Sequence, residues 1–185
     1  MILFRAFPWD AKVGAGTRGG ALWFPRMLQG SGRHDNPTIF GCLYVSQDPL
    51  SPVVERLARF AGRALTEDKL VSRGLPVALA ALDLPDDVQL IDLDDPAVLE
   101  REGLRPSRVA THDRSVTQQG AAELFETHTG AAGLRWWSTF ESLWANVTLF
   151  DRAEASLSVE DVRPLELGDD VVVEAADFLG LPIST

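Results

Sequence analysis

The chain has 185 residues, of which 45% are hydrophobic and 24% charged, and its formal net charge is −10. This length and composition predict one soluble globular domain with a sizeable core. The acidity argues against direct nucleic-acid binding, because such binding depends on Lys and Arg neutralising phosphates. An individual arginine can still bind a small phosphate-bearing ligand, since its planar fork pairs with two oxygens at once.

The sequence also indicates a compartment. No apolar run approaches the ~18 residues that a membrane span needs, and the start of the chain, Met1–Arg5, lacks the pattern of a signal peptide. The single cysteine, Cys42, cannot form an internal disulfide. We therefore expect a protein of the reducing cytoplasm, without a membrane association.

The first third of the chain predicts loops, then a strand, then a helix. Repeated Gly and Pro residues between Gly14 and Pro37 indicate turns. The segment 38–46 is rich in β-branched and aromatic residues and predicts a strand. Ser51 and Pro52 resemble an N-cap and first helical residue, so the apolar spacing that follows predicts an amphipathic helix over 52–65. Glu55 would then lie in its first turn.

The remaining elements mix strands and helices without regular alternation. They are two strands at 76–84 and 88–93 joined by a Pro-Asp-Asp turn, a short helix from Asp95-Pro96 to near Gly103, a helix at 115–127 followed by Gly130, strands at 133–138 and 146–150, and a helix at 170–179. This order favours an α+β fold over a doubly wound parallel sheet.

The common signals of nucleotide and metal chemistry are missing. Gly14-x-Gly16 does not extend to GxGxxG, and there is no Walker sequence. One cysteine and three scattered histidines give no zinc spacing, so we expect no metal site. His128 follows a predicted helix, where capping is the expected role. The acidic clusters lie among turn residues and are interpreted as solvated surface.

One less common pattern remains. Arg33 stands in a Gly-rich loop, Tyr44 follows eleven residues later in a predicted strand, and Glu55 follows after eleven more. A Gly-flanked arginine suits the close approach of a phosphate, and a tyrosine offers a flat face to an aromatic ring. From spacing alone, a surface ion pair for Arg33, a core position for Tyr44 and a helix-dipole partner for Glu55 remain open.

Several short motifs, in order, resemble those of the RES domain, a family named for Arg, Glu and Ser residues. The first are Gly32–Pro37, Phe40–Ser46 and Val53–Glu55. The others are Leu3–Arg5, which holds an early arginine, Asp113–Gln118, Gly133–Ser138, which holds the serine, and Asn146–Phe150. The resemblance covers roughly residues 3–151, and we expect a single RES domain over 1–185 whose residues 152–185 form a C-terminal extension with a closing helix.

The resemblance implies a fold, an activity and a partner. The fold would resemble ADP-ribosyltransferases, with two small β-sheets flanked by helices around a cleft that binds NAD. The family acts as the toxin of type II toxin–antitoxin pairs and depletes NAD by hydrolysis or phosphorolysis, so NAD is the substrate and inorganic phosphate a candidate co-substrate. The antitoxin is commonly an Xre-like helix-turn-helix protein that covers the active site, and the toxins often form homodimers.

The resemblance also implies residue roles. Arg33, with Arg5, would hold the phosphates of NAD. Tyr44 would stack on nicotinamide or the ribose edge, and Glu55 would stabilise the oxocarbenium ion or orient water or phosphate. Ser138 would fix the nicotinamide side by hydrogen bonding, although a strand-end hydroxyl that bonds to backbone is the alternative.

Three features depart from the family pattern. His34 stands where many members have an aromatic residue, Trp136-Trp137 replaces a tyrosine-proline pair, and the segment 14–32 is long and Gly-rich. We expect at least one of the two tryptophans in the core. Two other functions stay open: a protein mono-ADP-ribosyltransferase, and an inactive RES-like protein that only binds an antitoxin.

Overall fold

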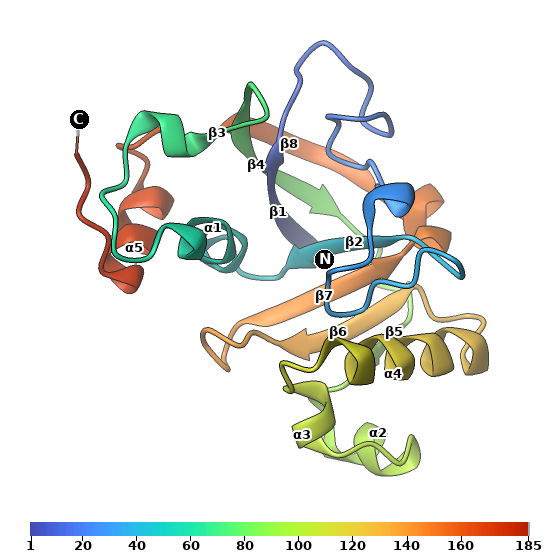
Figure 1. The fold of residues 1–185 in the computed structure, drawn as a ribbon. Coiled ribbons are helices and arrows are strands. Elements are labelled where there is room, and N and C mark those ends of the chain that lie inside the picture. Colours follow the sequence, from blue (N-terminus) through green and yellow to red (C-terminus); the bar gives the residue numbers. More distant parts are fainter. Residues whose placement is uncertain (185) are drawn as a thin grey trace. The chain divides into compact units, whose positions relative to one another are not determined.

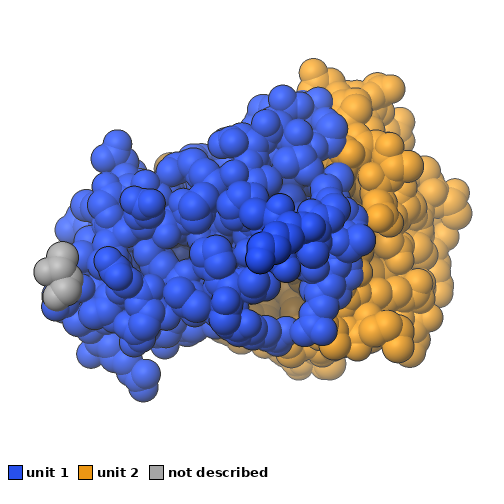
Figure 2. Space-filling model, turned by 90° about the horizontal axis from the view of Figure 1, so that it is seen from above, with its two compact units in different colours: residues 1–23, 46–83, 158–185 blue, residues 24–45, 84–157 orange. Residues whose placement is uncertain are grey.

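The computed structural model describes residues 1–184, which form two compact units. Unit 1 comprises residues 1–23, 46–83 and 158 onward, and unit 2 comprises residues 24–45 and 84–157 (Figure 2). Each unit combines strands with helices (Figure 1), which confirms the predicted α+β class. Among the described helices, none has the length and apolar character needed to cross a membrane.

The sheet of unit 1 is built around β4 (Leu75–Asp83). β1 (Ile2–Pro8) pairs antiparallel along one edge of β4, and β8 (Ser158–Pro164) pairs antiparallel with it as well. The short β3 (Val71–Ser72) forms a hairpin with the start of β4. Val77, Ala78, Leu79 and Ala80 of β4 are all buried, so both faces of the strand are covered there, because successive side chains point to opposite faces.

The helices of unit 1 are α1 (Leu50–Leu57) and α5 (Asp170–Leu179), which pack against each other. α5 ends at Gly180, whose φ of 64° is the left-handed conformation that favours glycine at a helix end. The unit also contains two 3₁₀ helices, η2 (Ala58–Phe60) and η3 (Glu67–Leu70).

The strands of unit 2 follow the order β2-β7-β6-β5. They are β2 (Cys42–Ser46), β7 (Ala145–Phe150), β6 (Gly133–Trp137) and β5 (Leu90–Asp92), with β6 antiparallel to β7 and parallel to β5. The helices are α2 (Pro96–Arg101), α3 (Pro106–Val109) and α4 (Arg114–Thr127), with the 3₁₀ helices η1 (Arg26–Leu28) and η4 (Asp151–Ser156). The final residue of β2, Ser46, belongs to unit 1 and pairs with Phe4.

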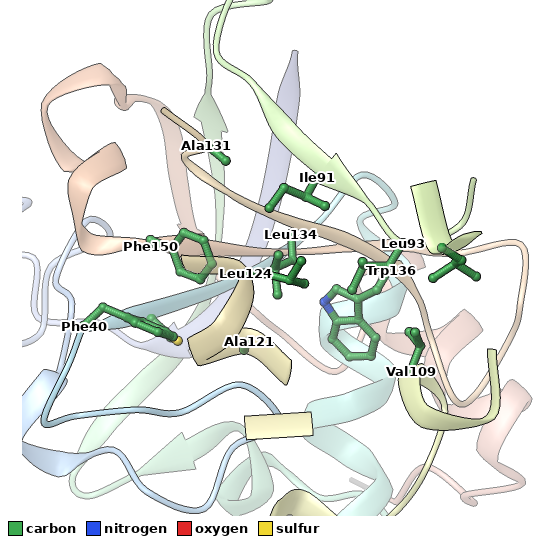
Figure 3. Close-up of a cluster of buried hydrophobic side chains, with 12 residues drawn as sticks. Phe40, Ile91, Leu93, Val109, Ala121, Leu124, Ala131, Leu134, Trp136 and Phe150 are labelled. Atoms are coloured by element: carbon green, nitrogen blue, oxygen red, sulfur yellow. The ribbon is translucent and has the colours of Figure 1, made fainter. Parts of the chain in front are cut away.

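An apolar cluster in unit 2 joins the sheet to α4 (Figure 3). Phe40 and Phe150 lie at one end of the cluster, and Trp136 lies beside Leu93 and Val109 at the other. The rings of Phe40, Phe125 and Phe150 have centroids 4.5–5.0 Å apart. Such aromatic groups contribute a large share of core stability because they bury much area.

Most predicted elements are confirmed, with small shifts at their ends. The strands near 76–84, 88–93, 133–138 and 146–150 are present as β4, β5, β6 and β7. The helices at 115–127 and 170–179 are α4 and α5, and α2 begins at Pro96, where the Asp95 carboxylate accepts from Ala97 N–H. The prediction did not include β1, β3, β8 or α3, which are short or lack a clean apolar alternation.

The predicted helix over 52–65 is wrong in both bounds. Leu50 N–H donates to the Asp48 carboxylate at 2.8 Å, so the helix begins at Leu50, before Ser51 and Pro52. It ends at Leu57, and the chain leaves the helical path near Gly62, whose φ is 77°. Glu55 therefore lies in the second turn of the helix and not in the first.

Gly133 allows β6 and β7 to approach closely. A Cβ atom at this residue would lie 2.4 Å from the carbonyl oxygen of Thr148, a backbone atom that cannot move aside cheaply. We expect Gly133→Ala to lower the free energy of unfolding by about 1–3 kcal/mol, as overpacking does, measured by urea denaturation. Gly130→Ala is the control, because nothing lies within 4 Å of the position that its Cβ would occupy. Equal stability of the two variants would contradict this packing argument.

Candidate functional site

The loop that carries Arg33 is held by one buried carboxylate. Asp35 Oδ2 accepts hydrogen bonds from the backbone N–H of Gly30 at 2.8 Å and of Gly32 at 2.7 Å. Asp35 Oδ1 accepts from the Tyr44 hydroxyl at 2.7 Å. Charge-assisted hydrogen bonds of this kind are among the strongest in proteins, so the loop is fixed to β2 at this point.

Tyr44 joins the loop to the strand in two ways. Its hydroxyl donates to Asp35 and accepts the backbone N–H of His34 at 2.9 Å. Burial, together with the neighbouring Cys42 thiol and Asp35 carboxylate, raises the pKa of Tyr44 well above its ordinary value, so the phenol stays protonated and can donate. A Cβ atom on Gly32 would lie 2.6 Å from this hydroxyl, which explains the glycine beside Arg33.

Arg33 is anchored at both ends of the residue and is only 5% exposed. Its carbonyl accepts from the Thr117 hydroxyl of α4. Its guanidinium Nη1 donates to the carbonyls of Val109 at 2.9 Å and Thr111 at 2.8 Å. The guanidinium carbon also lies 4.9 Å from the centre of the Trp136 ring, a cation–π distance. The arginine is thus positioned before any ligand binds.

His34 is buried on the same tryptophan. Its ring meets Trp136 edge-on, with centroids 5.3 Å apart, and its Nδ1 lies 2.8 Å from Thr148 Oγ1. Trp136 Nε1 donates to the same oxygen at 3.1 Å. Burial, reinforced by the positive charges of Arg33 and Arg114, lowers the pKa of His34 to about 3. The neighbour of Arg33 is therefore a neutral imidazole at physiological pH.

A cavity of about 20 Å³ lies beside His34 and is lined mainly by apolar residues of α4 and neighbouring elements. It has room for about one water molecule. A nucleotide is too large to enter it.

Ser138 follows β6 and is 2% exposed. Its Oγ accepts the backbone N–H of Phe140 at 3.2 Å, and its own N–H donates to the carbonyl of Trp144. The hydroxyl thus supports the turn between β6 and β7. This geometry matches the backbone-bonding alternative, and a contact with nicotinamide stays a prediction.

Arg5 and Glu55 belong to unit 1. Arg5 Nη1 donates to the carbonyl of Ala21 at 2.6 Å, and its guanidinium lies over the Phe7 ring at 4.9 Å. Burial lowers the pKa of Arg5 to about 10. Glu55 is exposed on α1. A role of these two side chains with NAD stays a prediction.

The structure brings Arg33 and Tyr44 together, as their spacing suggested, but through residues that the sequence did not single out. Asp35 links the two, and Trp136 with Thr148 supports Arg33 and His34. The acidic residue inside a Gly-rich loop was a usable signal, since such carboxylates often bind nearby backbone N–H groups. Trp136 is buried, which confirms the expectation of a tryptophan in the core.

The comparisons with known proteins identify the family. The RES domain matches residues 5–170, so the chain belongs to the RES domain family. Among solved structures, the chain is similar to one in the crystal structure of the M. tuberculosis MbcT–MbcA toxin–antitoxin complex, with a TM-score of 0.61 and 17% sequence identity. The alignment covers 97% of this chain and 88% of that one. No curated protein matches the sequence.

The buried neutral His34 predicts a pH dependence of stability. Its folded pKa of about 3 lies below the ordinary value of 6.5, so its contribution is fully present above pH 6.5 and is lost as the pH falls toward 3. We expect the wild type to lose about 1.4 kcal/mol per pH unit more than His34→Gln across this window. The exposed His112 provides the control variant His112→Gln. Parallel curves for wild type and His34→Gln would show that folding does not lower the pKa of His34.

Removal of the Tyr44 hydroxyl tests the loop anchor. Tyr44→Phe leaves Asp35 Oδ1 and His34 N–H without this partner, so we expect the free energy of unfolding to fall by about 1–3 kcal/mol. The matched control is Thr127→Val, because the exposed Thr127 hydroxyl donates only to a carbonyl of its own helix. If both variants unfolded at the wild-type urea concentration, Tyr44 would not anchor the loop.

Proposed function

We propose that this protein is the toxin of a type II toxin–antitoxin pair and depletes NAD by cleaving the nicotinamide–ribose bond, with water or phosphate as acceptor. The observation that carries the proposal is the RES domain match, which extends over residues 5–170 and includes Arg5, Arg33, Tyr44, Glu55 and Ser138. The fold supports it, because the chain resembles a protein solved in a toxin–antitoxin complex.

The chemistry of NAD defines what such an enzyme must supply. Nicotinamide is already cationic in NAD, so it leaves without a general acid, and the ribose develops oxocarbenium character as in glycoside cleavage. The enzyme must hold the pyrophosphate, orient the ribose and stabilise its developing positive charge. An arginine and a carboxylate are suited to these tasks.

In this proposal Arg33, assisted by Arg5, holds the phosphates. The anchoring of Arg33 by Val109 and Thr111 supports this role, because a guanidinium that is already fixed loses less conformational freedom on binding.

The other roles follow from residue chemistry. Glu55 is an exposed carboxylate and would stabilise the ribosyl cation or orient the incoming water or phosphate. The partly buried ring of Tyr44 would contact nicotinamide or the ribose edge, while its hydroxyl holds the loop. Ser138 would fix the nicotinamide side. The antitoxin would be an Xre-like helix-turn-helix protein that covers this surface, and we place the pair in the cytoplasm.

Glu55→Gln tests the proposal directly. It keeps the size of the side chain but removes the negative charge, so NAD loss should fall at least about 100-fold, in line with the loss of one electrostatic catalytic group, while thermal stability changes little. NAD consumption is measured by an enzymatic cycling assay. Glu174→Gln, an exposed carboxylate on α5, is the control and should retain wild-type activity. A folded Glu55→Gln variant with wild-type activity would refute the assignment.

The products separate the alternatives. With labelled NAD and cell lysate, free ADP-ribose or its phosphate supports NAD depletion, whereas a labelled protein band supports a mono-ADP-ribosyltransferase. Growth arrest on expression that disappears with Glu55→Ala argues against an inactive antitoxin-binding protein. If purified wild-type protein left NAD intact and its expression did not slow growth, the inactive alternative would replace the proposal.

A further inference from the structure

Helix α4 binds the carbonyl groups of the loop that carries Arg33. The side-chain amide of Gln118 donates from Nε2 to the carbonyl of Gly32 at 2.8 Å and to the carbonyl of Gly30 at 3.2 Å. The Thr117 hydroxyl donates to the carbonyl of Arg33 itself. The loop thus has N–H groups bound by its own carboxylate and carbonyls bound by two adjacent residues of α4.

A hydrogen bond in the reverse direction completes this contact. The Asn36 side chain donates from Nδ2 to the main-chain carbonyl of Gln118 at 2.8 Å and to the carbonyl of His34 at 3.1 Å. Gln118 therefore donates to the loop through its side chain and accepts from the loop through its main chain. Hydrogen-bond networks of this kind rigidify the segments that they join.

The chain just before α4 holds the other end of Arg33. The carbonyls of Val109 and Thr111 accept hydrogen bonds from the guanidinium. One short stretch, residues 109–118, therefore binds both the main chain and the guanidinium of the same arginine. If the main chain were released from α4 while the guanidinium stayed on these carbonyls, the direction of the guanidinium fork would change.

The next residue of the helix shows that this use of a glutamine is specific. Gln119 Nε2 donates to the Glu123 carboxylate at 2.9 Å, one turn further along α4. This is the usual pairing of side chains four residues apart on a helix surface. Gln118 instead reaches a glycine that lies 86 residues earlier in the chain. Of these two neighbouring glutamines, Gln118 is the one whose side chain connects α4 to the loop of Arg33.

We propose that Gln118, assisted by Thr117, is a positioning residue for Arg33. By holding the carbonyls of the loop, it sets the direction from which the guanidinium meets the phosphates of NAD. This inference rests on the proposed function, in which Arg33 holds those phosphates. It gives a role in ligand binding to Asp113–Gln118, one of the segments that resemble the RES family.

The chemistry of the reaction determines which kinetic constant should change. The phosphates of NAD keep their charge while the nicotinamide–ribose bond breaks, so a correctly placed Arg33 binds substrate and transition state equally well. Interactions of that kind lower KM and leave kcat unchanged. Loss of the position of Arg33 should therefore raise KM, whereas loss of the Glu55 charge lowers kcat.

Gln118→Leu and Gln119→Leu compare the two amides. Each variant removes one side-chain amide from α4 and adds no charge that could itself repel NAD. We expect Gln118→Leu to raise the KM for NAD about three- to tenfold at unchanged kcat, as for the loss of one hydrogen bond. Gln119→Leu should keep both constants. A purely structural role of Gln118 would lower the melting temperature and leave the KM of the folded enzyme at the wild-type value.

Thr117 provides an independent check through rescue. Thr117→Val removes the hydroxyl that binds the Arg33 carbonyl and should raise the KM for NAD in the same way. Thr117→Ser keeps a hydroxyl that can donate, so its KM should return toward the wild-type value. Equal KM values of the two variants would contradict a positioning role of this hydroxyl.

The affinity for ADP-ribose separates this inference from the proposed function, because ADP-ribose carries the same diphosphate and has no nicotinamide to lose. If the wild type binds ADP-ribose in isothermal titration calorimetry but leaves NAD intact, the proposed reaction fails, and weaker binding by Gln118→Leu than by Gln119→Leu still supports the positioning role. The inference is overturned if these two variants have equal KM values and equal affinities for ADP-ribose, if Gln118→Leu lowers kcat alone, or if the wild type binds neither NAD nor ADP-ribose.

Discussion

The hydrogen bonds of the Asp35 carboxylate hold the loop of unit 2 that carries Arg33. The carboxylate accepts hydrogen bonds from two backbone N–H groups of the Gly-rich loop and from the Tyr44 hydroxyl. These bonds join the loop to strand β2. The loop has few apolar side chains to bury, so hydrophobic packing cannot fix it. A single carboxylate with several donors can, because charge-assisted hydrogen bonds to backbone N–H groups are stronger than neutral ones. Arg33 lies in this loop, so the hydrogen bonds of Asp35 help to fix its position.

A second requirement is that the positive charge of Arg33, which is buried next to the core, must have partners. The Arg33 guanidinium donates to two backbone carbonyls and lies over the face of Trp136. His34, its neighbour, remains neutral and directs its ring nitrogen to Thr148, which also receives the Trp136 N–H. A charged imidazole beside the guanidinium would add repulsion in a low dielectric. The departure of His34 from the aromatic residue common in the family is therefore compatible with the fold, because a neutral ring packs as an aromatic does.

The sequence predicted most of the helices and strands but missed β1, β3, β8 and α3, which are short or lack a clean apolar alternation. The helix at 115–127 is present and its first turn is capped by the Asp113 carboxylate, and the helix at 170–179 is present and ends before Gly180. The helix predicted over 52–65 is too long because the apolar spacing continues through Ala61 and Leu65, whereas the helix ends at Leu57 and Leu65 pairs with the C-terminal segment. Arg33 and Tyr44 were found from their spacing and family motifs. Asp35 and Thr148 were not. The Gly-rich loop around Asp35 was a usable signal, whereas the role of Thr148 depends on which donors surround it in space.

The individual arginines of this acidic protein have different environments. Arg33 and Arg152 both donate to carbonyls and lie over aromatic rings, and Arg152 contacts the end of α4 through the carbonyls of Phe125 and His128. Arg56 also has a buried nitrogen, Nη2, but this nitrogen has no hydrogen-bond partner among the described residues. Burial, followed by the charges of Arg59 and Arg73, lowers the pKa of Arg56 to about 10. A buried donor without a partner costs free energy, so burial of a guanidinium stabilises the fold only where carbonyls receive it, as they do at Arg33 and Arg152.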